Sequence, residues 1–296
     1  MVRINKKTIN GNSYFYLEHA MRKNGQVKKK ELYLGKNIPH NIEELKRKFL
    51  SEIRKEKWHP LLNSIKKGYA EELKRMPVSA RQKEQETFAV RFTYDTQRIE
   101  GSTLTLRETA DLLEKGISPH AKPIGDIKEA EAHKDLFQEV LECKKDLSLS
   151  LVLHWHRRLF LGTKPDIAGQ IRTHQVAISG SRFMPPFPAE IYPLLMDFFT
   201  WYSKKKGTLH PVELAALVHL KFVTIHPFTD GNGRMSRLMM NFILNRHDYP
   251  LFNIPYEGRK SYYTALERAQ VKKTDSIFLN WFIKQYMHQQ KRFLKG

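Results

Sequence analysis

A twelve-residue polar segment, from His226 to Arg237, contains the residue types from which a phosphate-binding site can be built. It reads HPFTDGNGRMSR. Apolar residues at helical spacing precede it over residues 214–223 and follow it over residues 238–243, so we expect two buried helices around a tight loop. The end of the segment begins the second helix, where free backbone N–H groups and the positive end of the helix dipole attract anions.

The glycines and arginines of the segment strengthen the prediction of an anion site. Gly231 and Gly233, on either side of Asn232, permit backbone conformations that a Cβ atom would block, and these let successive N–H groups turn inward. Arg234 and Arg237 lie three residues apart and therefore project from one face of the helix. Their guanidinium groups suit phosphate oxygens.

Two other side chains offer a base and a metal ligand. His226 can accept a proton near neutral pH. Asp230 offers a hard oxygen to Mg²⁺, which proteins usually hold through one or two carboxylates and substrate phosphates. Alone, each of these features is more often an ordinary loop residue or turn. Together within twelve residues they are the parts of a phosphoryl-type transfer site.

The segment also resembles the signature of the Fic family, His-Pro-Phe-x-Asp/Glu-Gly-Asn-Gly-Arg-x-x-Arg, with no departure. Weaker similarity extends over about residues 85–285. The resemblance implies a mainly helical Fic core. It also implies a nucleotidyltransferase, specifically a protein adenylyltransferase, which moves AMP from ATP to a Ser, Thr or Tyr hydroxyl of a protein.

The resemblance further implies a role for each residue of the motif. His226 would deprotonate the target hydroxyl, and Asp230 would hold Mg²⁺ against the α- and β-phosphates of ATP. The triplet 231–233 would form the anion hole, Arg234 would bind the β-phosphate and Arg237 the γ-phosphate. The hydroxyl would then attack the α-phosphorus, and pyrophosphate would leave.

Residue 233 bears on which group is transferred. A related kinase branch of the family carries Lys at this position, so Gly233 favours AMP transfer over phosphorylation. The motif defines the phosphates more firmly than the base. Transfer of UMP or phosphocholine therefore remains an alternative, as does a nucleic-acid-associated regulator that uses the site as a nucleotide sensor.

A β-hairpin is predicted within the non-helical stretch 169–188, because residues 176–178 and 182–184 flank a Ser-Gly-Ser turn. It resembles the flap of the family, which implies an edge on which a target segment docks by strand addition. A plain surface hairpin is the alternative. The candidate docking residues are Ile178, Ser179, Gly180, Ser181, Arg182 and Phe183.

Tyr262 and Tyr263 belong to a segment, residues 258–263, that resembles the part of the family near the adenine. The resemblance implies that either ring stacks on the base of the nucleotide. Packing at the start of a helix explains the two tyrosines equally well.

The segment Thr96–Gly101 resembles the inhibitory motif of the family, Ser/Thr-x-x-x-Glu-Gly/Asn. Its place before the core implies the class with an N-terminal inhibitory helix. Glu100 would pair with Arg237 and so exclude the γ-phosphate, and Glu100→Gly would release the enzyme. In some members this glutamate supports removal of AMP, so de-AMPylation stays open. The alternative is a surface glutamate at a helix end, with Gly101 as its C-cap.

Helices must position these residues, and we predict that they dominate residues 79–296. A capping box at Thr105–Glu108 opens a helix that stops at Gly116. Apolar periodicity predicts further helices over residues 82–98, 126–143, 148–160, 188–205, 211–225, 233–246, 259–270 and 275–293. The expected fold class is mainly α, a Fic helical core with a small β-hairpin flap.

Residues 1–78 are expected to form a separate extension, a β-meander followed by helices. Asn-Gly pairs at residues 10–11 and 24–25 are strong hairpin signals and divide residues 1–36 into three antiparallel strands. Tyr14, Tyr16, Tyr33 and Leu34 are expected on one face of that sheet. Two helices, 41–58 and 61–76, should then be separated at His59-Pro60.

The charge of the chain points to a second kind of partner. The formal net charge is +20, and residues 1–80 contain 19 Lys/Arg against 8 Asp/Glu. Such a basic region suits nucleic acid, and the predicted meander resembles a small unit at the N-termini of some transposases. A solvated basic surface is the alternative.

Cysteine usage and hydropathy bear on the compartment. The single Cys143 permits no internal disulfide, and no Cys/His set has zinc-ligand spacing. No apolar run approaches the roughly 20 residues that span a bilayer, and the N-terminus lacks a signal-peptide pattern. We therefore expect a cytoplasmic protein without a membrane partner, and the sequence leaves a homodimer open.

Overall fold

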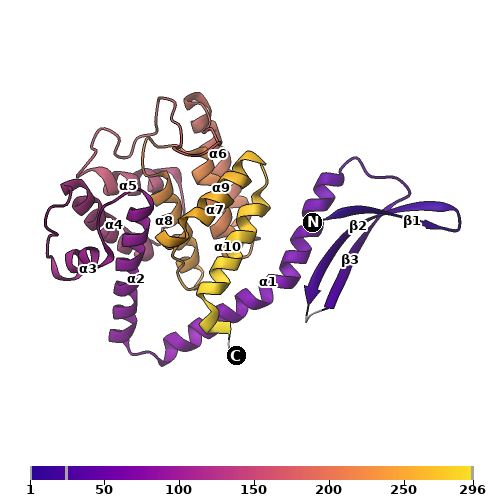
Figure 1. Cartoon of the computed structure of the whole chain (residues 1–296), viewed down its shortest axis with the longest axis horizontal. Helices are drawn as coiled ribbons and strands as arrows, with labels where there is room; N and C mark the ends of the chain where they lie inside the picture. Colours follow the sequence, from indigo (N-terminus) through magenta and orange to yellow (C-terminus); the bar gives the residue numbers. More distant parts are fainter. Residues whose placement is uncertain (1, 24–25, 295–296) are drawn as a thin grey trace. The chain divides into compact units, whose positions relative to one another are not determined.

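The computed structural model describes residues 2–23 and 26–294, so the predicted Asn24-Gly25 turn lies outside the described residues. The chain divides into two compact units, Met1–Asn63 and Ser64–Gly296. Figure 1 shows a small β-sheet in the first unit and a helical assembly in the second. The boundary near residue 78 that the sequence suggests falls between the first two helices and remains a prediction.

The N-terminal unit contains the predicted meander. Strands β1 (Arg3–Ile9), β2 (Asn12–Lys23) and β3 (Gln26–Gly35) pair antiparallel in the order β1-β2-β3. Asn10 and Gly11 connect β1 to β2 with positive φ angles of 50° and 78°, as an Asn-Gly hairpin turn requires. The sheet packs one face against the first part of α1 (Ile42–Arg75), where Leu17 meets Phe49 and Ile53.

The expectation that Leu34 shares a face with the three tyrosines was wrong. Tyr16 pairs with Tyr33, and the rings of Tyr14 and Tyr33 lie 6.2 Å apart, so the tyrosines do share a face. Leu34 directly follows Tyr33 in β3, and because successive side chains of a strand point to opposite faces, Leu34 packs with the core around Leu17 instead.

The expected break at His59-Pro60 was also wrong, because α1 continues through Pro60. A proline inside a helix costs a hydrogen bond and a steric clash, about 3 kcal/mol. Trp58, Leu62 and Ile65 lie four and three residues apart and are all buried. Burial of such an apolar stripe contributes enough to offset the cost of the proline.

The second unit is helical. Its core consists of α7 (Pro211–Ile225) and α8 (Asn232–Arg246), most of whose residues are buried. Helix α8 packs against α2, α4, α5 and α7, and α7 packs also against α6 and α10 (Figure 1). The remaining elements are α2 (Val78–Ile99), α3 (Leu106–Lys115), α4 (Ile124–Glu142), α5 (Leu149–Phe160), α6 (Pro188–Lys205), the 3₁₀ turn η1 (Tyr256–Gly258), α9 (Arg259–Val271), α10 (Asp275–Gln289) and the 3₁₀ turn η2 (Lys291–Leu294).

The predicted helix signals act as expected. The side chain of Thr105 caps α3 and Glu108 completes the capping box, while Gly116 ends the helix in the left-handed conformation. Within the described residues, no helix combines the length and the apolar character needed to cross a membrane.

The segment predicted as a hairpin contains its turn but no paired strands. Ser181 N–H donates to the Ile178 carbonyl at 3.1 Å, and Gly180 has a φ of 74°. Residues 176–184, all described, carry no strand assignment. Pro185 and Pro186 lie just after this segment, and since proline has no N–H the second arm cannot extend a backbone ladder. We call residues 174–186 the flap.

Candidate functional site

His226 lies where α7 ends, and its side chain is half-buried. It is the C-cap of α7, with a left-handed φ of 53°, and its N–H still donates to the Phe222 carbonyl. Ring atom Nδ1 lies 3.2 Å from the Val223 carbonyl. A proton on Nδ1 is donated to that carbonyl, which leaves the Nε2 lone pair as an acceptor. Burial lowers the pKa of His226, with a smaller opposing effect from the Val223 hydrogen bond, so the ring is neutral at pH 7.

The loop after His226 is held from inside by two side chains. The Asn232 carboxamide accepts from Phe228 N–H at 2.9 Å and donates to the Phe228 carbonyl at 2.8 Å. The Phe228 ring stacks on His156 with centroids 3.7 Å apart. Because Gly169 N–H donates to His156 Nδ1, the other ring nitrogen donates to the Asp230 carbonyl. The Asn232 side chain therefore shapes the loop and does not point to a ligand.

Both glycines of the predicted anion cradle lie where a side chain would collide. Gly231 has a φ of 83°, and a Cβ there would lie 2.4 Å from the Phe160 ring. A Cβ on Gly233 would lie 2.4 Å from Glu100 Oε1 and 3.0 Å from an Arg237 nitrogen. The space above Gly233 is thus the space in which Glu100 and Arg237 meet.

Asp230 is an ionised carboxylate between two cations. Lys164 Nζ lies 2.7 Å from Oδ2, and an Arg234 nitrogen lies 2.9 Å from Oδ1. Burial would raise the pKa of Asp230, but the charges of Arg234 and Lys164 outweigh it and lower the pKa to about 2. The described residues contain no group of three His, Cys, Asp or Glu side chains suited to a metal. A hard cation such as Mg²⁺ fits here if substrate phosphates supply further oxygens.

Arg234 is almost fully buried among polar partners. Besides Asp230, it donates to a Glu129 carboxylate oxygen and to Gln97 Oε1 at 3.2 Å. Glu129 also receives the Lys164 ammonium at 2.9 Å. Two cations and two carboxylates therefore form one closed network on this side of α8.

Arg237 makes the contact that the inhibitory motif predicts. Its guanidinium lies 2.6 Å from Glu100 Oε1, and Glu100 is the C-cap of α2 and not within the helix. The same guanidinium donates to the carbonyl of Thr96 and lies 3.4 Å from the Tyr262 hydroxyl. Glu100 keeps about a quarter of its side chain exposed, whereas Arg237 keeps 1%.

Comparison with known proteins assigns this arrangement to a family. The model of the Fic/DOC family matches residues 146–244. The solved structure of Fic-1 (residues 134–508) from Caenorhabditis elegans is 30% identical, has a TM-score of 0.69, and the match covers 86% of this chain and 77% of that one. The chain belongs to the Fic family.

Curated Fic proteins are similar over the helical part. The protein adenylyltransferase Fic of Drosophila melanogaster is 39% identical over 181 residues, which cover 60% of this chain. The protein adenylyltransferase fic-1 of Caenorhabditis elegans is 36% identical over 187 residues, or 61% of this chain. The chain spans about a third, 36%, of the length of these relatives. A solved Fic-domain signaling protein from Bacteroides thetaiotaomicron is 27% identical, with a TM-score of 0.69 and coverage of 78% of this chain and 96% of that one.

The Fic site opens into a cavity of about 460 Å³. His226, Arg237 and Glu100 line it, together with the flap turn 178–181 and Tyr263. A slightly larger hollow of about 530 Å³ near Tyr69 and Arg292 contains none of the motif residues. The chemistry therefore belongs to the smaller cavity.

The two tyrosines near the Fic site differ in exposure. Tyr262 is 1% exposed, and its hydroxyl lies 3.0 Å from His219 and within reach of Arg237, so its ring offers no free face to a nucleobase. Tyr263 is 47% exposed and donates its hydroxyl proton to the Ile99 carbonyl at 2.9 Å. Only the second has a ring surface on which a base can stack.

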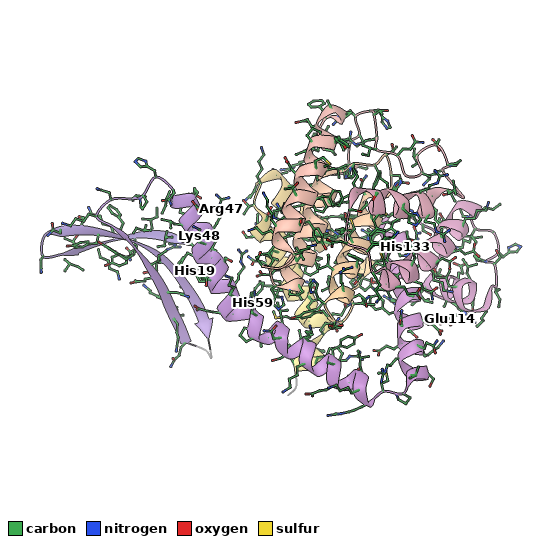
Figure 2. All side chains as sticks on the ribbon, turned by 180° about the vertical axis from the view of Figure 1, so that it is seen from behind. His19, Arg47, Lys48, His59, Glu114 and His133 are labelled. Carbon is green, nitrogen blue, oxygen red and sulfur yellow. The ribbon has the colours of Figure 1, made fainter. Side chains whose placement is uncertain are left out.

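Several residues that hold the Fic site were not found from the sequence. Glu129, Lys164 and Arg172 lie outside any motif, and no local pattern marks them. His133, at the centre of the helical unit in Figure 2, accepts or donates a hydrogen bond with Thr93 at 2.9 Å. Burial and the charges of Arg234 and Arg237 lower the pKa of His133 to about 3, so it adds no charge beside the arginines.

Proposed function

We propose that this chain is a protein adenylyltransferase, which moves AMP from ATP to a Ser, Thr or Tyr hydroxyl of a protein. The observation that carries the proposal is the neutral His226 beside Gly233 and Arg237, all three lining one cavity that the flap borders. The names of the curated relatives support the same activity.

The residues of the site divide the work of the transfer. His226 Nε2 takes the proton of the target hydroxyl, whose oxygen then bonds to the α-phosphorus of ATP. The bond from that phosphorus to the bridging oxygen breaks, and pyrophosphate leaves with the electron pair. The cradle at 231–233 and the arginines hold the phosphates through N–H groups. Asp230 would hold Mg²⁺, which when bound supplies charge neutralisation at the phosphates.

We further propose that Glu100 keeps the enzyme inhibited. Its carboxylate occupies the guanidinium of Arg237 at 2.6 Å, which a γ-phosphate would otherwise take. A carboxylate and a phosphate cannot both use this fork, because Glu100 and Arg237 already fill the space above Gly233. Removal of the Glu100 side chain frees Arg237 and the space above Gly233.

The test compares wild type, Glu100→Gly and Glu100→Gly/His226→Ala after incubation with ATP and Mg²⁺, with intact masses as the readout. We expect one or more AMP additions on Glu100→Gly, and at least about 100-fold slower addition on the double variant. Glu142→Gly, at the exposed end of α4, is the matched control and should behave as wild type. Equal modification of wild type and Glu100→Gly would refute the inhibition.

The transferred group is tested in the same samples. UTP and CDP-choline are offered in place of ATP, because the site holds phosphates more firmly than a base. Mass additions of UMP or phosphocholine that exceed those of AMP would replace the adenylyl assignment. Removal of AMP is tested by adding the wild-type protein to the modified product and measuring loss of the added mass. Light scattering tests whether the protein forms a homodimer. A cytoplasmic location is a further prediction.

We also propose that the N-terminal unit binds nucleic acid. Residues 1–63 contain 15 Lys/Arg against 6 Asp/Glu. On the sheet face opposite Leu17, the ring of Tyr33 lies 5.3 Å from that of Tyr16, and Lys7 lies over Tyr16. Exposed aromatic rings among cations suit stacking on bases and contact with phosphates.

Fluorescence anisotropy with labelled DNA, single- and double-stranded, tests this second function on the full chain. Binding should weaken steeply with salt and fall when Tyr16 and Tyr33 are both changed to Ala. Tyr192→Ala, an exposed tyrosine of α6, is the control. Lack of binding at low salt would end the proposal and leave the transferase assignment untouched.

A further inference from the structure

Arg172 is a buried cation whose hydrogen-bond partners are all backbone carbonyls. Its side chain donates to the carbonyls of His226 at 2.9 Å, His174 at 2.8 Å and Pro186 at 2.7 Å. Its own N–H donates to the Pro227 carbonyl at 2.9 Å. The residue is 3% exposed, and among the described residues no carboxylate lies within ion-pair distance of it.

Burial of the Arg172 charge without a carboxylate partner in the described part of the chain costs free energy, which suggests that the residue has a specific role. A buried charge without a counter-ion is unfavourable unless its hydrogen bonds are well satisfied. An apolar side chain would fill the same space at lower cost. Unlike an apolar residue, the arginine can donate to three separate carbonyls at once from a single planar group.

The three carbonyls belong to the two parts of the site that must meet a target. His174 and Pro186 are the two ends of the flap, and His226 is the base. The flap lacks paired strands, so Arg172 supplies a connection between its ends, alongside the 3.0 Å bond from Gln175 to the Pro185 carbonyl. The same guanidinium sets the distance from the flap to the backbone of the base.

We propose that Arg172 is a positioning residue that holds the flap at a set distance from His226, so that a docked hydroxyl lies within reach of the base. This inference rests on the proposed transferase function. It assigns Arg172 to alignment of the protein target and not to nucleotide binding, since Arg172 makes no contact with the cradle at 231–233. Misplacement by about 1 Å is enough to slow such a reaction roughly 100-fold.

The experiment places Arg172→Met and Arg172→Lys in the Glu100→Gly protein. Lysine keeps the charge but is too compact a donor to span three carbonyls, so it serves as the second variant if methionine fails to fold. Arg246→Met is the matched control, because Arg246 also donates to two carbonyls, those of Lys144 and Lys145, away from the site. Circular dichroism establishes that each variant is folded.

The first readout does not depend on activity. Arg182 is exposed in the flap and is its only Lys or Arg, so trypsin cleavage after Arg182 reports how firmly the flap is held. We expect the fragment that ends at Arg182 to form at least about tenfold faster in the Arg172 variants than in Arg246→Met. Equal cleavage in folded variants would overturn the clamp, whether or not any AMP is transferred.

The second readout separates target alignment from nucleotide binding. We expect the single-turnover rate of self-modification to fall roughly 10- to 100-fold, while the Kd for ATP changes less than about threefold. A parallel loss of ATP affinity, or an unchanged rate with a loosened flap, would overturn the positioning role. If the Glu100→Gly parent itself transfers nothing, the transferase proposal has failed, and the cleavage result still decides whether Arg172 holds the flap.

Discussion

Two charge clusters lie at the start of α8, one around Arg234 and one around Arg237. The first contains two cations and two carboxylates, with Lys164 and Arg234 facing Glu129 and Asp230. The second contains one ion pair, Arg237 with Glu100. Both arginines are buried, but they differ in the number of acids they meet among the described residues, because Arg234 contacts both Glu129 and Asp230 whereas Arg237 contacts Glu100 alone.

Arg237 also has neutral partners that would remain if its carboxylate partner were lost. Arg237 keeps hydrogen bonds to Thr96 and the Tyr262 hydroxyl if Glu100 is removed. Burial raises the pKa of Tyr262 to about 12, so this partner stays uncharged. Loss of Glu100 therefore leaves a supported cation that faces the cavity. The contrast suggests the expectation, which rests on the proposed function, that Glu100 is replaceable because it is the single described carboxylate partner of Arg237, whereas Glu129 shares its cations with Asp230.

The largest expected effect is a difference in the free energy of unfolding between variants of Glu129 and variants of Glu100. Glu129→Gln should lower the free energy of unfolding by roughly 3 kcal/mol, because it leaves buried Arg234 and the partly exposed Lys164 with one carboxylate between them. Glu100→Gln should lower it by about 1 kcal/mol or less, since its carboxylate is partly solvated. Urea unfolding of the two variants measures both values. Similar losses would remove the distinction between network and inhibitor.

A Lys164 variant tests the role of the first cluster, because the Lys164 ammonium contacts Asp230, the carboxylate that is expected to hold Mg²⁺. In the Glu100→Gly protein, Lys164→Met should lower the Mg²⁺ concentration for half-maximal transfer by roughly tenfold, or about 1.4 kcal/mol, as a competing cation is lost. Lys206→Met, which breaks an ion pair with Asp146 elsewhere, is the control. A higher Mg²⁺ requirement would mean that Lys164 assists the metal.

Gly233 tests how tightly the second cluster is packed. Gly233→Ala should destabilise the wild-type protein by about 1 kcal/mol, because its Cβ meets the Glu100 carboxylate at 2.4 Å. In the Glu100→Gly protein the loss should be smaller, which a double-mutant cycle in thermal unfolding measures. Gly258→Ala, where a Cβ meets no atom within 4 Å, controls for the change of residue type. Additive effects would mean that the two positions do not touch.

The smallest expected effect concerns pH. His226 must be neutral to take a proton, and burial lowers its pKa below the ordinary 6.5. The acid limb of the rate should therefore lie below pH 6.5 in the Glu100→Gly protein, with activity lost as pH falls through the lowered pKa. A profile of kcat/KM against pH reports this value for the free enzyme. An acid limb above pH 6.5 would contradict a buried neutral base.

Local patterns accounted for most of the helices and for the residues of the loop. Gly116 ends α3 and Thr105 caps it, as their sequence signals predict. The pairing of Glu100 with Arg237, 137 residues apart, followed from resemblance to a family and not from any local rule. At Pro60, burial of an apolar stripe outweighed a local preference, whereas at Leu34 the alternation of side chains along β3 decided the face.

By itself, the sequence determined the loop between α7 and α8, since Gly, Asn and Arg act there through backbone geometry and nearest neighbours. Only the tertiary structure decided which side chains pair with these residues. Glu129 reaches Arg234 across 105 positions, Lys164 reaches Asp230 across 66, and Arg172 reaches His226 across 54. Such contacts arise because buried charges need partners wherever the packed helices bring them, and spacing along the chain does not encode that meeting.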